Sequence, residues 1–125
     1  MTNSERGKYS KSKGKRFERA IANYFKERGY NTRRSAQYCG KTGEAADVVG
    51  LPDMHIECKD VEKLNIRKAM EQATNDCMEH NDKTGDSLVP VVIHHQKRYP
   101  TLVTMYLDDW TALYMASHDP ENSSK

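Results

Sequence analysis

Apolar residues recur at helical spacing in two stretches of the chain. In the first stretch they occupy positions Phe17, Ala20, Ile21, Tyr24 and Phe25. Intervals of three and four residues are typical of a helix that turns one face towards a core. Gly29 comes after Lys26 and Arg28 and is typical of the residue that follows a helix end. The pattern therefore predicts an amphipathic helix that starts near residue 15 and ends before Gly29.

A second helix is predicted after Asn65. Its apolar positions are Ile66, Ala69, Met70, Ala73 and Cys77. Asn65 is a favourable N-cap, because its side chain can accept a hydrogen bond from an early helix N–H. A third, shorter helix is expected near the end of the chain, where Asp108 or Asp109 would be the N-cap.

Short apolar runs bounded by turn residues predict the strands. They cover residues 30–34, a β-hairpin over residues 46–59 with its loop at 51–53, and residues 88–93 and 101–107. Pro90 indicates a sheet edge or an irregular strand start. The order of helix, three strands, helix, two strands and helix predicts an α/β or α+β sheet covered by helices.

The length of 125 residues is that of one domain. Residues 1–13 are polar and basic and are predicted to be a flexible N-terminal arm. Residues 14–116 would form the folded domain, and residues 117–125 a disordered tail. Two glycines and little apolar content predict a loop over residues 35–44.

Charge is distributed unevenly along the chain, although the formal net charge is only +2. Residues 1–44 contain 12 Lys and Arg against 4 Asp and Glu, whereas residues 45–125 contain 8 against 14. A basic first third favours a polyanionic partner. A soluble basic arm without a partner would have the same composition.

The cysteines and the hydropathy pattern narrow the class of protein. Three cysteines without a C-x-x-C pair argue against a disulfide framework and a structural zinc site. No run of 18 apolar residues is present, so no membrane partner is expected. The sequence thus predicts a protein of a reducing compartment, the cytoplasm.

The hairpin carries the candidate chemistry. With a loop at residues 51–53, Asp47 stands directly opposite Glu57, and Lys59 shares their face of the sheet. Opposed carboxylates in a strand pair destabilise each other unless a positive charge lies between them. A divalent cation with oxygen ligands is the expected one, and Lys59 alone is the weaker alternative.

A cation held by carboxylates can activate a water molecule, and an adjacent ammonium group can neutralise charge on a phosphate. Together they are suited to phosphodiester hydrolysis. Oxygen ligands suit Mg²⁺ or Mn²⁺ and not zinc. Glu18, on the border of the first helix's apolar face, would be a third acid. Asp53, in the turn, is the rival of Asp47, and a solvated ion-pair cluster is the alternative to a metal site.

The order of Glu18 in a first helix, Asp47 before a turn, Glu57-Cys58-Lys59 on the next strand and then a helix resembles the PD-(D/E)XK nuclease superfamily. Within it, the Lys-Gly-Lys-Arg-Phe-Glu-Arg start is similar to archaeal-type and phage Holliday junction resolvases. The resemblance implies an α/β fold with a restriction-endonuclease-like core, in which helices flank a mixed central sheet of about five strands. It also implies a Mg²⁺-dependent cut in DNA and a homodimer.

By this resemblance the metal ligands are Glu18, Asp47, Glu57 and the carbonyl of Cys58, and Lys59 is the catalytic cation. Ser35 falls where such resolvases have a functional loop. The residues expected to contact DNA are Lys13, Lys15, Arg16, Arg33, Arg34, Ser35 and Lys41.

The sequence therefore predicts a metal-dependent DNA endonuclease, foremost a Holliday junction resolvase that acts on branched DNA such as a four-way junction. If a phage encodes it, it would work in the host cytoplasm. The alternatives are a phage or restriction-type endonuclease on plain duplex DNA and a non-catalytic nucleic-acid-binding module.

Overall fold

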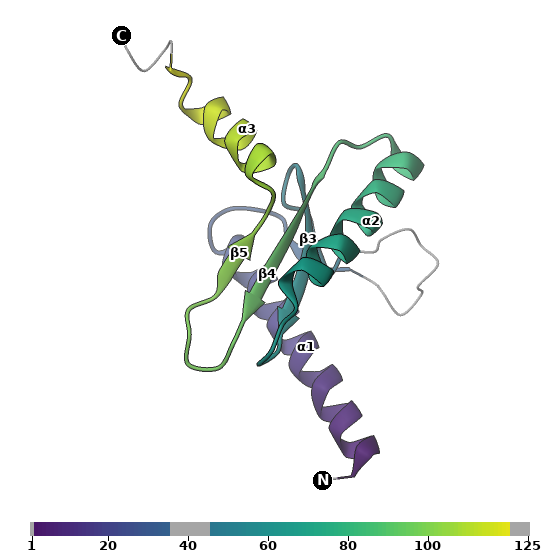
Figure 1. Ribbon diagram of the computed structural model, residues 1–125. Helices are drawn as coiled ribbons and strands as arrows, with labels where there is room; N and C mark the ends of the chain where they lie inside the picture. Colours follow the sequence, from purple (N-terminus) through teal and green to yellow (C-terminus); the bar gives the residue numbers. More distant parts are fainter. Residues whose placement is uncertain (1, 36–45, 121–125) are drawn as a thin grey trace.

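The computed structural model has one β-sheet with helices on both faces (Figure 1). It describes residues 2–35 and 46–120. The elements are α1 (Asn3–Lys26), β1 (Arg33–Arg34), β2 (Val48–Val49), β3 (Met54–Asp60), α2 (Ile66–Thr84), β4 (Val89–His95), β5 (Leu102–Thr104) and α3 (Leu107–Ser117). None of the helices in these residues is long and apolar enough to cross a membrane.

The sheet is mixed and has five strands in the order β1-β2-β3-β4-β5. Among the strands of the described residues, only β3 and β4 run parallel, and α2 is the connection between them. The other neighbours are antiparallel. The predicted α/β fold with about five strands is confirmed.

The β2–β3 hairpin has the predicted register, because Val48 pairs with Ile56. Its turn needs unusual backbone angles, with φ of 100° at Gly50 and 68° at Asp53. A Cβ at Gly50 would lie 2.1 Å from the carbonyl oxygen of Asn31, so only glycine fits there. The turn thus fixes which residues of the two strands face each other.

Side chains of β3 and β4 alternate between two apolar layers. Towards α1 the buried core consists of Ile21, Ala22, Val48, Ile56, Cys58, Val91 and Ile93. Towards α2 it consists of Ala69, Met70, Ala73 and Val92. Because alternate strand residues face opposite ways, Glu57 and Lys59 lie on the α2 side. The prediction that Ile56 and Cys58 point away from Glu57 is confirmed.

The first helix begins earlier than predicted. Residues 3–13, expected to be a flexible arm, form the first turns of α1. Thr2 and Glu5 form a capping box, in which the Glu5 N–H donates to Thr2 Oγ1 at 3.1 Å and the Thr2 N–H donates to Glu5 Oε2 at 3.3 Å. This cap starts the helix without apolar residues, which is why the hydrophobic pattern missed it.

The C-terminal elements also differ from the prediction. Strand β5 ends at Thr104, and the N-cap of α3 is Tyr106, which makes no side-chain cap. Asp108 and Asp109, predicted as caps, lie in the first turn, where a negative charge favours the helix dipole. The predicted tail over residues 117–125 lies mostly outside the described residues.

Candidate active site

Asp47 and Glu57 meet at the open end of the β2–β3 pair. Asp47 directly precedes β2, and its Oδ2 accepts a hydrogen bond from the Cys58 N–H at 2.8 Å. The pairing of Val48 with Ile56 places Asp47 opposite Glu57, and the charge of Asp47 helps to raise the pKa of Glu57. The sequence prediction that these two acids face each other is therefore confirmed.

Glu57 is buried, with only 3% of its surface exposed. Burial, the charge of Asp47, a hydrogen bond with Asp47 and the charge of Asp76 raise its pKa to about 9, against a lowering by Lys59. The group is therefore protonated at neutral pH when no cation is bound. Its Oε1 has no hydrogen-bond partner, so a buried oxygen atom is left unsatisfied.

Helix α2 packs on this face of the sheet and contributes Gln72 and Asp76 to the site. The Lys59 Nζ donates to Gln72 Oε1 at 3.3 Å. Asp76, one helical turn further, lies close enough for its charge to raise the pKa of Glu57, and burial raises the pKa of Asp76 itself. Sequence reasoning gave no role to Asp76. The available signal was its spacing of four from Gln72, which places both on one side of the helix.

Glu18 reaches the site from α1 but is held by another residue. The Arg34 Nε donates to Glu18 Oε1 at 3.1 Å in an ion pair whose side chains are largely buried. Burial and then the charge of Asp47 raise the pKa of Glu18, whereas Arg34 and Lys15 lower it. Glu18 is therefore close enough to Asp47 for the two charges to interact, although it already forms an ion pair with Arg34.

The fit to a divalent cation depends on Asp47 and Glu57. Among the described residues no three His, Cys, Asp or Glu side chains form a group ready to hold a metal ion. The pair still suits Mg²⁺, which proteins usually bind through one or two carboxylates plus water and phosphate. The unsatisfied Glu57 Oε1 supplies a free ligand atom.

The backbone of Cys58 can add a further oxygen ligand. In a strand, the N–H and C=O of one residue point to the same side. Because the Cys58 N–H is directed at Asp47, its carbonyl also points to that side of β3. The carbonyl therefore lies on the same side of β3 as Asp47, and the thiol lies in the core on the α1 side.

Asp53 is not part of this cluster. It lies exposed in the hairpin turn with a φ of 68°, and its carbonyl accepts a hydrogen bond from Val89 N–H at 2.8 Å. It lines a different hollow, which also contains His80 and Asp86. Of the two rival acids, the structure brings Asp47 and not Asp53 to Glu57.

His55 is the buried neighbour of Glu57 along β3. Its Nε2 lies 3.5 Å from Glu57 Oε1, and burial and the charge of His80 lower its pKa to about 4. The ring is therefore neutral at pH 7. The two residues share a face of the strand, as the alternation of side chains predicts.

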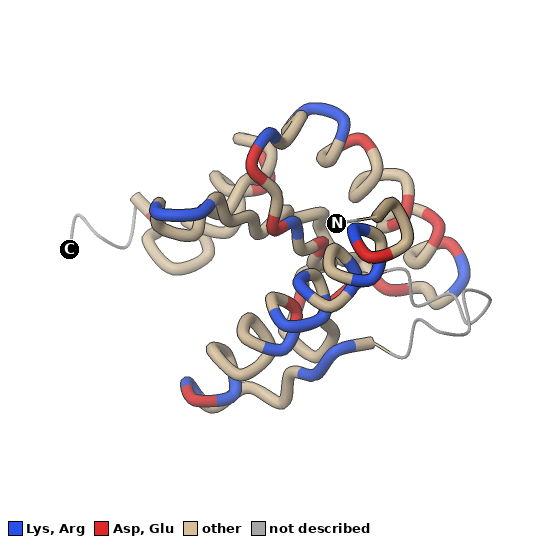
Figure 2. The backbone as a smooth tube through the Cα atoms, turned by 90° about the horizontal axis from the view of Figure 1, so that it is seen from below, with Lys and Arg blue, Asp and Glu red and all other residues tan. Residues whose placement is uncertain are grey.

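The residues predicted to contact DNA lie in more than one place. Basic residues gather along α1, whereas α2 is the more acidic helix (Figure 2). The charge of Lys15 lowers the pKa of Glu18, and Arg33 and Arg34 form β1. Lys13 pairs with Asp60 at 3.7 Å. Of these residues, Lys15 and Arg34 lie at Glu18 and give that end of the site a basic border. Lys13 instead lines the groove on the other side of α1, and Arg33 lines the hollow that contains Asp53.

The other three residues predicted to contact DNA, Arg16, Ser35 and Lys41, lie in different surroundings. Arg16 lines a groove on the opposite side of α1 from Glu18. Ser35 is buried beside the site, where its N–H donates to the Asp47 carbonyl at 3.1 Å and its Oγ has no partner. Lys41 lies outside the described residues.

The raised pKa of Glu57 predicts how stability depends on pH. The folded protein holds a proton on Glu57 up to about pH 9, whereas the unfolded chain loses it near the model value of 4.5. The stabilisation is therefore fully present below about pH 4.5 and is lost as pH rises towards 9. From this group the metal-free protein should lose about 1.4 kcal/mol of unfolding free energy per pH unit in that window.

Glu57→Gln should remove most of this loss, because glutamine stays neutral at every pH. Urea unfolding of the metal-free protein at several pH values measures the slope for both proteins. Glu62→Gln is the control, because Glu62 is exposed on the β3–α2 connection. Equal slopes for wild type and Glu57→Gln would contradict the assignment of a buried, protonated Glu57.

A family model described as "Phage putative PDDEXK endonuclease" matches residues 9–123. The matched range runs from α1 into the residues after α3 and spans the positions of Glu18, Asp47, Glu57 and Lys59. No curated protein and no solved structure matches the chain.

Proposed function

Because the chain belongs to the phage putative PDDEXK endonuclease family, we propose that it is a Mg²⁺-dependent DNA endonuclease that resolves four-way junctions. The observation that carries the proposal is the contact between Asp47 and the buried Glu57, with Lys59 on the same strand face. The five-stranded mixed sheet with flanking helices is consistent with a restriction-endonuclease-like core.

Asp47, Glu57 and the carbonyl of Cys58 are the residues that would hold the cation, Mg²⁺ or alternatively Mn²⁺. When bound, a divalent cation supplies positive charge that polarises the phosphate and activates water. Glu57 releases its proton to become a ligand, so binding should strengthen as pH rises. Glu18 is the proposed third carboxylate.

Lys59 supplies a fixed positive charge beside the acids. Its Nζ is held by Gln72 Oε1 at 3.3 Å, which positions the ammonium group on the α2 side. An ammonium there would stabilise the negative charge that develops on the phosphate during hydrolysis. Arg34, which pairs with Glu18, supplies a cation for the adjacent DNA backbone, together with Lys15 and Arg33.

Selectivity for branched DNA is the most specific part of the proposed function. It follows the similarity of the N-terminal sequence to junction resolvases, and a homodimer with two sites would match the symmetry of a four-way junction. Cleavage should be compared on a labelled four-way junction, a fork and a linear duplex of the same sequence in Mg²⁺.

We expect the junction to be cut at least about tenfold faster than the duplex, a difference of about 1.4 kcal/mol in transition-state stabilisation. Equal rates on junction and duplex would favour the plain-duplex endonuclease. Salt-sensitive binding of all three DNAs without any cleavage would favour a non-catalytic binding module.

A further inference from the structure

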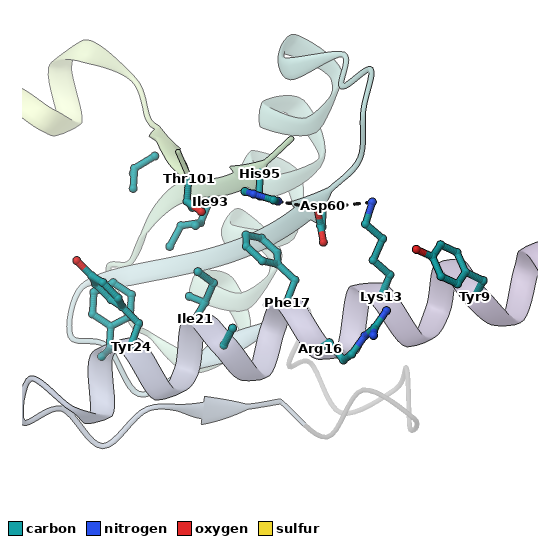
Figure 3. Close-up of a pocket in the computed structure, with 13 residues that line it drawn as sticks. Tyr9, Lys13, Arg16, Phe17, Ile21, Tyr24, Asp60, Ile93, His95 and Thr101 are labelled. Carbon is teal, nitrogen blue, oxygen red and sulfur yellow. Dashed lines mark hydrogen bonds and ion pairs between the residues drawn. The ribbon is translucent and has the colours of Figure 1, made fainter. Parts of the chain in front are cut away.

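A groove of about 700 Å³ lies between α1 and the β4–β5 edge of the sheet (Figure 3). Phe17 and Ile21 of α1 line one wall, and Ile93 and Val103 line the sheet side. Helix α1 packs mainly on β1, β2 and β3, so the sheet face is covered as far as Ile93 of β4 but is open at β5. Val103 is accordingly 60% exposed, although it pairs with the buried Ile93.

Helix α3 is apolar, but it does not pack against the sheet or the other helices. It buries none of its residues and extends away from the sheet (Figure 1). Its exposed large apolar residues are Leu107, Trp110, Leu113, Tyr114 and Met115. A helix that is apolar on most sides is normally buried against another surface. An apolar groove and an apolar helix are thus both left open on one molecule.

The helix cannot fill the groove of its own chain without rearrangement. The Tyr106 and Thr74 hydroxyl groups lie 3.0 Å apart, which ties the start of α3 to α2. Helix α2 covers the face of the sheet opposite to the groove. Only two residues separate β5 from α3. Without such a rearrangement, α3 can reach this groove only on another copy of the chain.

We propose that α3 of one copy lies in the α1–β5 groove of a second copy, and that the exchange is reciprocal, giving a closed twofold dimer. The charges are complementary, because Asp108 is exposed on the first turn of α3 and Arg16 is exposed at the groove. Arg16 makes no ion pair with any other described residue.

The available area agrees with this dimer. A stable interface buries about 800 Å² on each partner. Trp110 and Tyr114 are about half exposed, and each offers on the order of 100 Å² of further burial. In a reciprocal dimer each copy buries both its α3 and its groove, so the two contacts add together towards this area. The inference does not depend on the nuclease reaction.

The test is the molar mass in solution, measured by light scattering or sedimentation over a range of concentrations. Wild type should be a dimer. Leu113→Asp removes the helix contact and Val103→Asp the groove contact, and each should raise the dissociation constant about 100-fold or more. Both positions are exposed, so folding should persist in circular dichroism. Met78→Asp, at an exposed methionine of α2, should remain dimeric.

Mixing the two defective variants distinguishes this interface from like-with-like contacts. A heterodimer of Leu113→Asp with Val103→Asp retains one intact helix and one intact groove, so the mixture should associate more strongly than either variant alone. A monomeric wild type, a dimer insensitive to either variant, an open polymer or a mixture that does not associate would each overturn the proposal.

Discussion

Replacing Lys59 with methionine should lower the rate of DNA cleavage about 10²- to 10³-fold, as expected for the loss of one fixed charge at a phosphate. Methionine keeps the unbranched side chain but removes the ammonium group that Gln72 holds. Lys59 also lowers the pKa of Glu57, so its loss makes Glu57 harder to deprotonate. Single-turnover kinetics at saturating Mg²⁺ measure the chemical step.

Lys63→Met is the matched control, because Lys63 is exposed on the β3–α2 connection. It should cleave at nearly the wild-type rate, and both variants should bind DNA with similar affinity. If Lys59→Met retained full activity, Lys59 would not be the catalytic cation.

The second large effect concerns Asp47. Asparagine can still accept the hydrogen bond from the Cys58 N–H, so Asp47→Asn should remove the charge and leave the hairpin intact. A direct ligand is then weakened, and the loss of metal affinity should exceed the roughly 10- to 100-fold that removal of an outer partner costs. Calorimetric titration with Mg²⁺ or Mn²⁺ measures this affinity.

The same substitution should not destabilise the metal-free protein as pH rises towards 9, because the charge of Asp47 is one cause of the raised pKa of Glu57. Asp53→Asn is the control, since asparagine tolerates the positive φ of this exposed turn position. It should bind metal and cleave like wild type. Full metal affinity in Asp47→Asn together with a loss in Asp53→Asn would reverse the choice of acid.

The hairpin and the faces of its strands were predictable because local rules determine them. The loop at residues 51–53 fixes the register, and the alternation of side chains then separates Glu57 and Lys59 from Ile56 and Cys58. The opposition of Asp47 and Glu57 follows from these two facts alone.

Contacts between distant segments were not predictable from the pattern. The ion pair of Glu18 with Arg34 and the contact of Asp76 with Glu57 depend on how α1 and α2 cross the sheet. The N-terminal extension of α1 over residues 3–13 begins at the Thr2–Glu5 capping box, because these residues have almost no apolar side chains at helical spacing. The apolar residues of α3 predicted a helix but not that it would stand apart from the core.

The proposed nuclease activity depends most on a cation bound between Asp47 and Glu57. The anomalous difference density of crystals grown with Mn²⁺ tests this directly. We expect a peak within coordination distance of both carboxylates and of the Cys58 carbonyl. Density elsewhere only, or carboxylates that turn away from each other into solvent with no ion between them, would contradict the site.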